Sequence, residues 1–117
     1  MVLAAVDDLL FTSKIASAAK QLGVELVFAR TSEEILRQAR ALRPALAIFD
    51  LNSQRTQPLA TITSLKADPA LASIRVVGFV SHVQSDLIEA ARAAGADEVL
   101  ARSAFTMRLP EILKSGM

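Results

Sequence analysis

The 117-residue sequence contains no cysteine, tryptophan or tyrosine, and only four glycines and four prolines. Without cysteine the chain can form no disulfide bond and no thiolate metal site, and it has no cysteine nucleophile. The 13 basic and 12 acidic residues give a formal net charge of +1, so no general attraction to nucleic acid or to an anionic membrane is expected. No apolar run approaches the roughly 20 residues that cross a bilayer. These absences predict a cytoplasmic protein without a direct nucleic-acid or membrane partner.

Apolar residues are abundant, at 52% of the chain, which is typical of a globular protein. A chain of this length holds one hydrophobic core and is too short for two. We find no internal repeat, linker or low-complexity segment. Residues 1–117 are therefore predicted to form a single domain.

Short apolar runs alternate with segments in which apolar residues recur at helical spacing. The runs are the expected strands, at residues 2–6, 24–28, 45–49, 74–80 and 97–101. The segments between and after them are the expected helices, at residues 9–22, 31–42, 58–66, 86–94 and 107–114. Alternation of this kind predicts an α/β fold, a doubly wound five-stranded parallel sheet with five helices. For a chain this short the flavodoxin-like strand order 2-1-3-4-5 is expected.

Local signals mark several helix ends. Gly23 and Gly95 follow helical segments and supply the left-handed residue that commonly ends a helix. Thr31 and Glu34 have the spacing of a capping box. Pro110 is acceptable in the last helix only within the first turn, where its missing N–H is not needed. The phenylalanines are expected to serve packing; they are Phe11, Phe28, Phe49, Phe79 and Phe105.

Polar and charged residues gather where the expected strands end. Asp7 and Asp8 follow the first strand, Asp50 the third, Ser81 the fourth and Arg102 the fifth. In the predicted order the first, third and fourth strands are neighbours, so these side chains should converge in one shallow pocket. Close carboxylates repel one another unless a cation compensates, and Mg²⁺ is the natural guest of such an oxygen-rich site. Arg102 could supply the compensating charge instead.

These strand ends, together with the passage 94–97 into the fifth strand, resemble a response-regulator receiver domain of the CheY-like superfamily. The resemblance covers the whole chain in element order and spacing. It implies that Asp50 is the phosphoacceptor and that Mg²⁺ is bound by Asp7, Asp8, Asp50 and the backbone carbonyl of Asn52.

The resemblance further implies that two residues bind the phosphoryl group. Ser81 would supply a hydroxyl and Arg102 a positive charge. Such a domain is not an enzyme with a separate substrate; at most it phosphorylates and dephosphorylates itself slowly at Asp50.

The sequence also departs from the family's pattern at three places. Arg102 and Ser103 stand where the family has Lys and Pro. The planar guanidinium of Arg presents a fork of hydrogen-bond donors, and it could pair permanently with Asp50 instead of contacting a phosphoryl group. The loop 53–58 reads Ser-Gln-Arg-Thr-Gln-Pro in place of the usual Met-Pro-Gly. The switch position, usually aromatic, is Val99. These departures mark an atypical or pseudo-receiver variant.

Two functions follow. The first is a phosphorelay receiver that takes a phosphoryl group on Asp50 from a histidine kinase or phosphotransfer protein. The alternative is a phosphorylation-independent pseudo-receiver that acts as a protein–protein interaction module. Either form would contact a downstream protein, or a second copy in a homodimer, through the face of helix 86–94, strand 97–101 and helix 107–114. His82, the only histidine, is expected to be a solvated loop residue.

Overall fold

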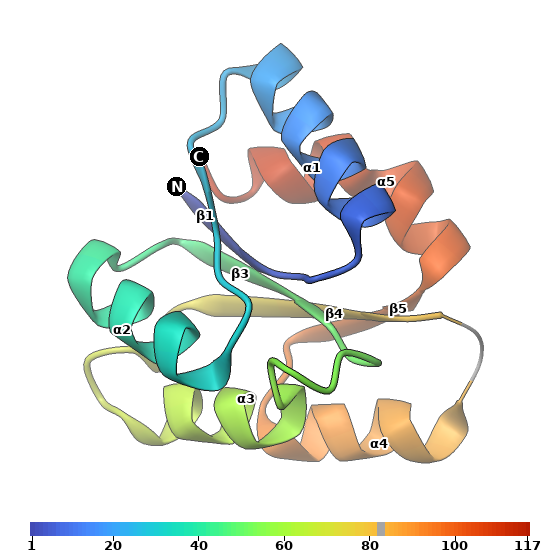
Figure 1. Cartoon of the computed structure of the whole chain (residues 1–117). Helices are drawn as coiled ribbons and strands as arrows, with labels where there is room; N and C mark the ends of the chain where they lie inside the picture. The colour runs from blue at the N-terminus through green and yellow to red at the C-terminus, as the bar shows by residue number, and fades with distance from the viewer. Residues whose placement is uncertain (82–83) are drawn as a thin grey trace.

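The computed structural model describes residues 1–81 and 84–117, and His82 therefore lies outside the described residues. Five strands alternate with five helices (Figure 1). The strands are β1 (Val2–Ala5), β2 (Leu26–Phe28), β3 (Leu46–Asp50), β4 (Arg75–Val80) and β5 (Glu98–Ala101). The helices are α1 (Leu9–Leu22), α2 (Ser32–Leu42), α3 (Pro58–Ala67), α4 (Ser85–Ala94) and α5 (Arg102–Lys114).

The strands form one parallel sheet in the order β2-β1-β3-β4-β5, which confirms the predicted fold class and strand order. In Figure 1, α1 and α5 cover one face of the sheet, and α2, α3 and α4 cover the other. β1 and β3 are buried along their whole length because helices lie over both of their faces.

Each face of the sheet has its own core. The core beneath α2, α3 and α4 contains Phe49 and Leu65, and the core beneath α1 and α5 contains Phe79. In the second core three phenylalanines are stacked. The Phe79 ring centroid lies 4.8 Å from that of Phe11 and 4.4 Å from that of Phe105. The predicted packing role of these rings is confirmed, whereas Phe28 is only half-buried on the edge strand β2.

The predicted ends of the first four helices lie within one residue of the observed ends, and their signals are visible. Gly23 caps α1 with a φ of 70°, and Gly95 caps α4 with a φ of 120°. The Thr31 hydroxyl accepts a hydrogen bond from the Glu34 amide at 3.2 Å at the start of α2. These helices therefore begin or end at the capping residues that the sequence predicts.

The last helix differs from the prediction. α5 begins at Arg102, five residues before the expected start, and Pro110 lies in its interior, so the expectation that Pro110 occupies a first turn is wrong. A proline inside a helix costs about 3 kcal/mol relative to alanine. Burial of four apolar side chains on α5 offsets this cost because each contributes about 1.5–3 kcal/mol. They are Phe105, Leu109, Ile112 and Leu113.

The two ends of the chain lie side by side (Figure 1). The Met1 ammonium donates a hydrogen bond to the Gly116 carbonyl at 2.8 Å. Among the described residues, none of the helices has the length and apolar character needed to cross a membrane.

Candidate functional site

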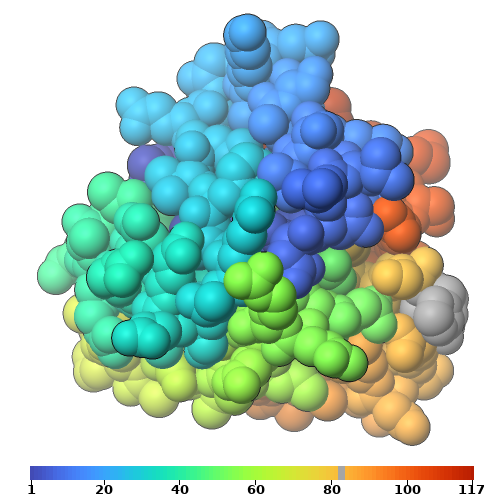
Figure 2. Space-filling view, in the orientation of Figure 1, coloured from blue at the N-terminus to red at the C-terminus, as the bar shows by residue number. Residues whose placement is uncertain are grey.

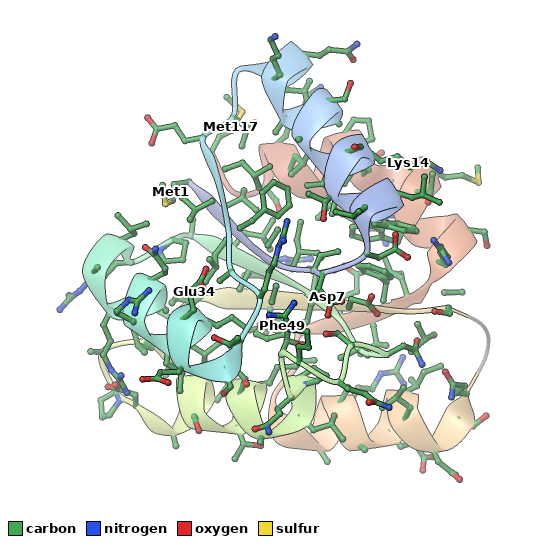
Figure 3. All side chains as sticks on the ribbon, viewed as in Figure 1. Met1, Asp7, Lys14, Glu34, Phe49 and Met117 are labelled. Carbon is green, nitrogen blue, oxygen red and sulfur yellow. The ribbon has the colours of Figure 1, made fainter. Side chains whose placement is uncertain are left out.

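The predicted site residues lie at the carboxyl edge of the sheet. Asp50 is the last residue of β3, Ser81 directly follows β4, and Arg102 is the first residue of α5. Asp7 lies in the loop between β1 and α1 (Figure 3), and Asp8 is the N-cap of α1. They meet there because parallel neighbouring strands end at the same edge, where ligands of this fold class bind.

Asp50 is the most enclosed of these carboxylates, with 9% of its surface exposed. One oxygen, Oδ1, accepts a hydrogen bond from the Asn52 amide at 2.9 Å. Burial raises the pKa of Asp50 above its ordinary value of 3.8, although the Asn52 hydrogen bond opposes the shift. The negative charges of Asp7 and Asp8 raise it further, and Arg102 partly counteracts them. Asp7 and Asp8 are therefore close enough to Asp50 to influence its ionisation.

Asp8 is already engaged by its own helix. Its Oδ1 accepts hydrogen bonds from the Leu10 amide at 2.9 Å and the Phe11 amide at 3.3 Å. Asp at an N-cap satisfies amides that have no partner within the helix. This contact leaves Oδ2 for another partner.

That partner is Arg102, whose Nη2 lies 3.7 Å from Asp8 Oδ2. The Arg102 guanidinium also lies over the Phe11 ring, 4.2 Å from its centroid, which is a favourable cation–π arrangement. The expectation that Arg102 could pair directly with Asp50 is wrong. The first residue of α5 faces the neighbouring α1, and there Asp8 and Phe11 are nearer partners.

Asn52 connects two loops through its side chain, a role that the sequence did not suggest. Its Nδ2 donates to Gln84 Oε1 at 2.7 Å, and its Oδ1 accepts from the Ser81 amide at 2.8 Å. Both neighbours lie beyond β4. The Asn52 side chain therefore ties Ser81 and Gln84, which both follow β4, to the loop after Asp50. This role is separate from the predicted binding of a metal by the Asn52 carbonyl.

The unusual loop 53–58 is held by hydroxyl groups. Ser53 and Thr56 are buried, and the Thr56 amide donates to Ser53 Oγ at 3.3 Å. Thr61 of α3 donates to the Thr56 carbonyl at 2.7 Å and lies 2.6 Å from the Ser32 hydroxyl of α2. These hydrogen bonds tie the loop to α3 and α2.

Val99 is buried in β5, opposite Gly78 of β4. A small branched side chain here has no aromatic ring that could move between a buried and an exposed rotamer. The absence of an aromatic residue at position 99 is known from the sequence. The structure shows in addition that this position lies in the core.

The charge of the site suits a hard divalent cation. Burial is the main cause of the raised pKa of Asp50, and the negative charges of Asp7 and Asp8 add to it, with Arg102 as the opposing positive charge. Carboxylate and carbonyl oxygens are the ligands that Mg²⁺ prefers. Within residues 1–81 and 84–117, however, no three acidic or histidine side chains form a ready-made metal cluster. A cation would have to draw Asp8 Oδ2 away from Arg102.

The prediction that one pocket contains all the strand-end residues holds only in part. Ser81 and Arg102 line a cavity between α1 and α5, and among the described residues that line it there is no aspartate. Phe11 and Lys14 of α1 also line it, and sequence reasoning missed both as site residues. Their spacing of three residues along the helix indicated only that they share a face.

We expect the Asp50→Asn variant to be more stable than the wild type at neutral pH without metal. The folded pKa of Asp50 is raised, so its neutral form favours folding and this stability is lost as pH rises from 3.8 through the folded pKa. Removing the charge should therefore raise the free energy of unfolding at neutral pH. Urea unfolding at neutral and acidic pH measures the difference, which should shrink toward acid.

Asp97→Asn is the matched control with the opposite sign. Burial raises the pKa of Asp97, but hydrogen bonds from the Val76 amide and Lys66, together with the positive charges of Lys66 and Arg75, lower it by more, so the net shift is downward. Ionised Asp97 therefore stabilises the fold above its unfolded pKa, and this stability is lost as pH falls through the folded pKa. Equal effects of both variants at both pH values would contradict the assignment.

No family model and no curated protein matches this chain. Solved structures do. The phosphorylated cyanobacterial phytochrome response regulator RcpA is 25% identical, with a TM-score of 0.80 over 97% of this chain and 87% of that one. The response regulator from Hahella chejuensis is 20% identical, with a TM-score of 0.87 over 99% of this chain and 93% of that one.

A third solved structure is a Mn²⁺-bound form of the response regulator Rcp1. It is 17% identical, with a TM-score of 0.81, and the match covers 95% of this chain and 89% of that one. All three structures share the fold of this chain over almost its whole length. The resemblance found in the sequence is confirmed at the level of the fold.

Proposed function

Because this chain has the fold of a response-regulator receiver domain, we propose that it acts in two-component signalling and that Asp50 accepts a phosphoryl group. The observation that carries the proposal is the nearly buried Asp50 carboxylate, with two further aspartates close enough to raise its pKa. Asp8 also caps α1, but a helix cap needs only one carboxylate, and the cap does not account for Asp7 and Asp50 beside it. Their presence at this edge of the sheet is explained by chemistry that brings in a cation and a phosphoryl group.

In the proposed reaction an Asp50 oxygen attacks phosphorus, and the bond from phosphorus to the donor breaks as the acyl phosphate forms. Ser81 and Arg102 would contact the phosphoryl oxygens. A divalent cation such as Mg²⁺, held by Asp7, Asp8, Asp50 and the Asn52 carbonyl, would supply positive charge at this site. Phosphorylated RcpA and Mn²⁺-bound Rcp1, which share the fold, support these two assignments.

The donor would be a histidine kinase or a phosphotransfer protein, which is the partner class that this fold implies. The proposed output surface is the face of α4, β5 and α5, where a downstream protein or a second copy of the chain would bind. Position 99 is a buried valine, so an aromatic rotamer switch at that face is excluded.

The test is incubation of the full chain with Mg²⁺ and acetyl phosphate, followed by intact-protein mass spectrometry. We expect a Mg²⁺-dependent gain of one phosphoryl group in the wild type, and no gain in Asp50→Asn because its amide is not a nucleophile. Asp86→Asn, on α4, is the control that changes an acidic residue away from the site. Binding of beryllofluoride, followed by NMR, should show the same dependence.

The second candidate function is a phosphorylation-independent interaction module. The observation that favours it is the Arg102–Asp8 pair at 3.7 Å, which occupies a predicted metal ligand with a fixed cation. An ion pair as exposed as this one contributes on the order of 1 kcal/mol or less to the stability of the fold, so a metal ion could displace Arg102 from Asp8. A wild type that gains no mass and binds no beryllofluoride would leave the interaction module as the function.

A further inference from the structure

A cavity of about 680 Å³ lies between α1 and α5, beside the aspartates but distinct from them. Figure 2 shows α1, in blue, and the start of α5, in orange, reaching the surface side by side. Sites for small molecules usually have volumes of about 300–1,000 Å³. The cavity is therefore large enough for a small organic molecule. Its lining consists of Phe11, Lys14, Ser81, Ala101, Arg102, Ser103 and Thr106.

The charge of this lining has one sign. Lys14 and Arg102 are its charged side chains, and no acidic side chain lines it within the part of the chain that the structure describes. Both cations are anchored on one ring: the Lys14 ammonium lies 5.7 Å and the Arg102 guanidinium 4.2 Å from the Phe11 centroid. Lys14 lies on α1 (Figure 3). Two positive groups are thus held at the mouth of one cavity.

Two hydroxyls and an apolar wall complete the lining. Ser81 and Ser103 are exposed and can donate hydrogen bonds, whereas the Thr106 hydroxyl already donates to the Arg102 carbonyl at 2.9 Å. Phe11, Ala101 and the carbon atoms of Thr106 are apolar. The N-cap of α5 is Ala101, which has no side-chain acceptor for the first amides of that helix. All these groups favour an anion with an apolar body.

We propose that this cavity binds a small organic phosphate, and that it does so without any contact to Asp50. The phosphate would lie between Lys14 and Arg102, and its organic part would lie against the apolar wall. This site goes beyond the proposed phosphorylation of Asp50, with which it shares Ser81 and Arg102. Because Arg102 also pairs with Asp8, a bound phosphate competes with Asp8 for the guanidinium.

The test uses phenyl phosphate and no Mg²⁺, so that binding is measured apart from the metal-dependent phosphorylation of Asp50. Titration followed by NMR should show saturable binding in the wild type. In Lys14→Gln the affinity should fall about tenfold, because a hydrogen bond to a charged group is lost. Lys20→Gln changes an exposed lysine six residues further along α1; it is the control and should bind as the wild type does.

Two further variants separate this site from the aspartates. Asp50→Asn should change the affinity for phenyl phosphate less than Asp8→Asn does, because Asp8 and not Asp50 is paired directly with Arg102, whereas a tenfold gain would place the anion beside Asp50 and overturn the proposal. Asp8→Asn keeps an N-cap acceptor and removes the charge that competes for Arg102, so its affinity should rise severalfold.

Inorganic phosphate should bind more weakly than phenyl phosphate because it leaves the apolar wall empty. Equal affinities would overturn the assignment of an organic ligand. Absence of saturable binding in the wild type, or equal binding by Lys14→Gln, would overturn the site itself. Neither result bears on Asp50, whose phosphorylation is read separately by mass.

Discussion

The Phe79→Ala variant should lose about 3–5 kcal/mol of unfolding free energy, the usual cost of removing a buried phenylalanine ring. Phe79 packs against both Phe11 and Phe105, whose own ring centroids lie 6.0 Å apart, and only 2% of its surface is exposed. Truncation leaves a cavity between two rings that belong to different helices, α1 and α5. A loss of this size is a large part of the total stability of an ordinary domain, about 5–15 kcal/mol.

The position of Phe79 also links the core to the site. In the sheet register it is the partner of Asp50, and the Leu51 amide donates to its carbonyl at 3.0 Å. Phe11, on which it stacks, supports Arg102. Loss of the ring should therefore loosen the site as well as the core.

Urea unfolding measures this prediction, with two comparisons. Phe28→Ala removes a half-buried ring from the edge strand β2 and should cost less than half as much. Phe79→Leu keeps most of the apolar volume and should fall between Phe79→Ala and the wild type. If Phe79→Ala and Phe28→Ala cost the same, the stack does not contribute as described.

The Gly95→Ala variant should cost about 3 kcal/mol, for two reasons that act together. Gly95 has a φ of 120°, a backbone conformation that residues with a Cβ rarely adopt. In addition, a Cβ at this position would lie 2.6 Å from Lys66 Cγ. Overpacking of a filled region costs about 1–3 kcal/mol by itself.

Lys66 cannot easily move away from a new methyl group. Its ammonium donates to the carbonyls of Ala72 at 3.2 Å and Ile74 at 2.8 Å, and to Asp97 Oδ2 at 3.1 Å. These bonds hold the end of α3 against the starts of β4 and β5. Shifting the lysine stem would strain or break them.

Gly23→Ala is the matched control, since Gly23 has a φ of 70° and an added Cβ would have no heavy atom within 4 Å. It should cost only the backbone strain, about 1–2 kcal/mol. Thermal unfolding of both variants gives the comparison. In a Lys66→Ala background the cost of Gly95→Ala should fall toward that of Gly23→Ala. An unchanged cost in that background would assign the whole effect to the backbone.

The fold could be predicted because its signals are local. Short buried runs end at polar residues, and helical segments end at Gly23, Gly95 or a residue before proline. Burial of a strand on both faces requires helices above and below it, so alternation alone implies the parallel sheet. The strand order then places Asp7, Asp8 and Asp50 at one edge without any knowledge of side-chain contacts.

The last helix shows where local reasoning fails. Proline is unfavourable in the interior of a helix, so helix propensity predicts that the last helix starts just before Pro110. The observed start at Arg102 depends on Phe105 and Leu109, which pack against the sheet and against α1. Tertiary burial outweighs the propensity of one residue, and that gain is visible only when the chain is folded.

The sequence by itself determined three features of the site. They are the acidic residues at the strand ends, the absence of an aromatic residue at position 99, and the unusual sequence of the loop 53–58. The tertiary structure alone decided that Arg102 pairs with Asp8 rather than with Asp50, and that it forms a cavity with Lys14. The reason is physical. Residue type and strand order determine which groups reach an edge of the sheet, but the direction of a side chain depends on how two helices distant in sequence pack together.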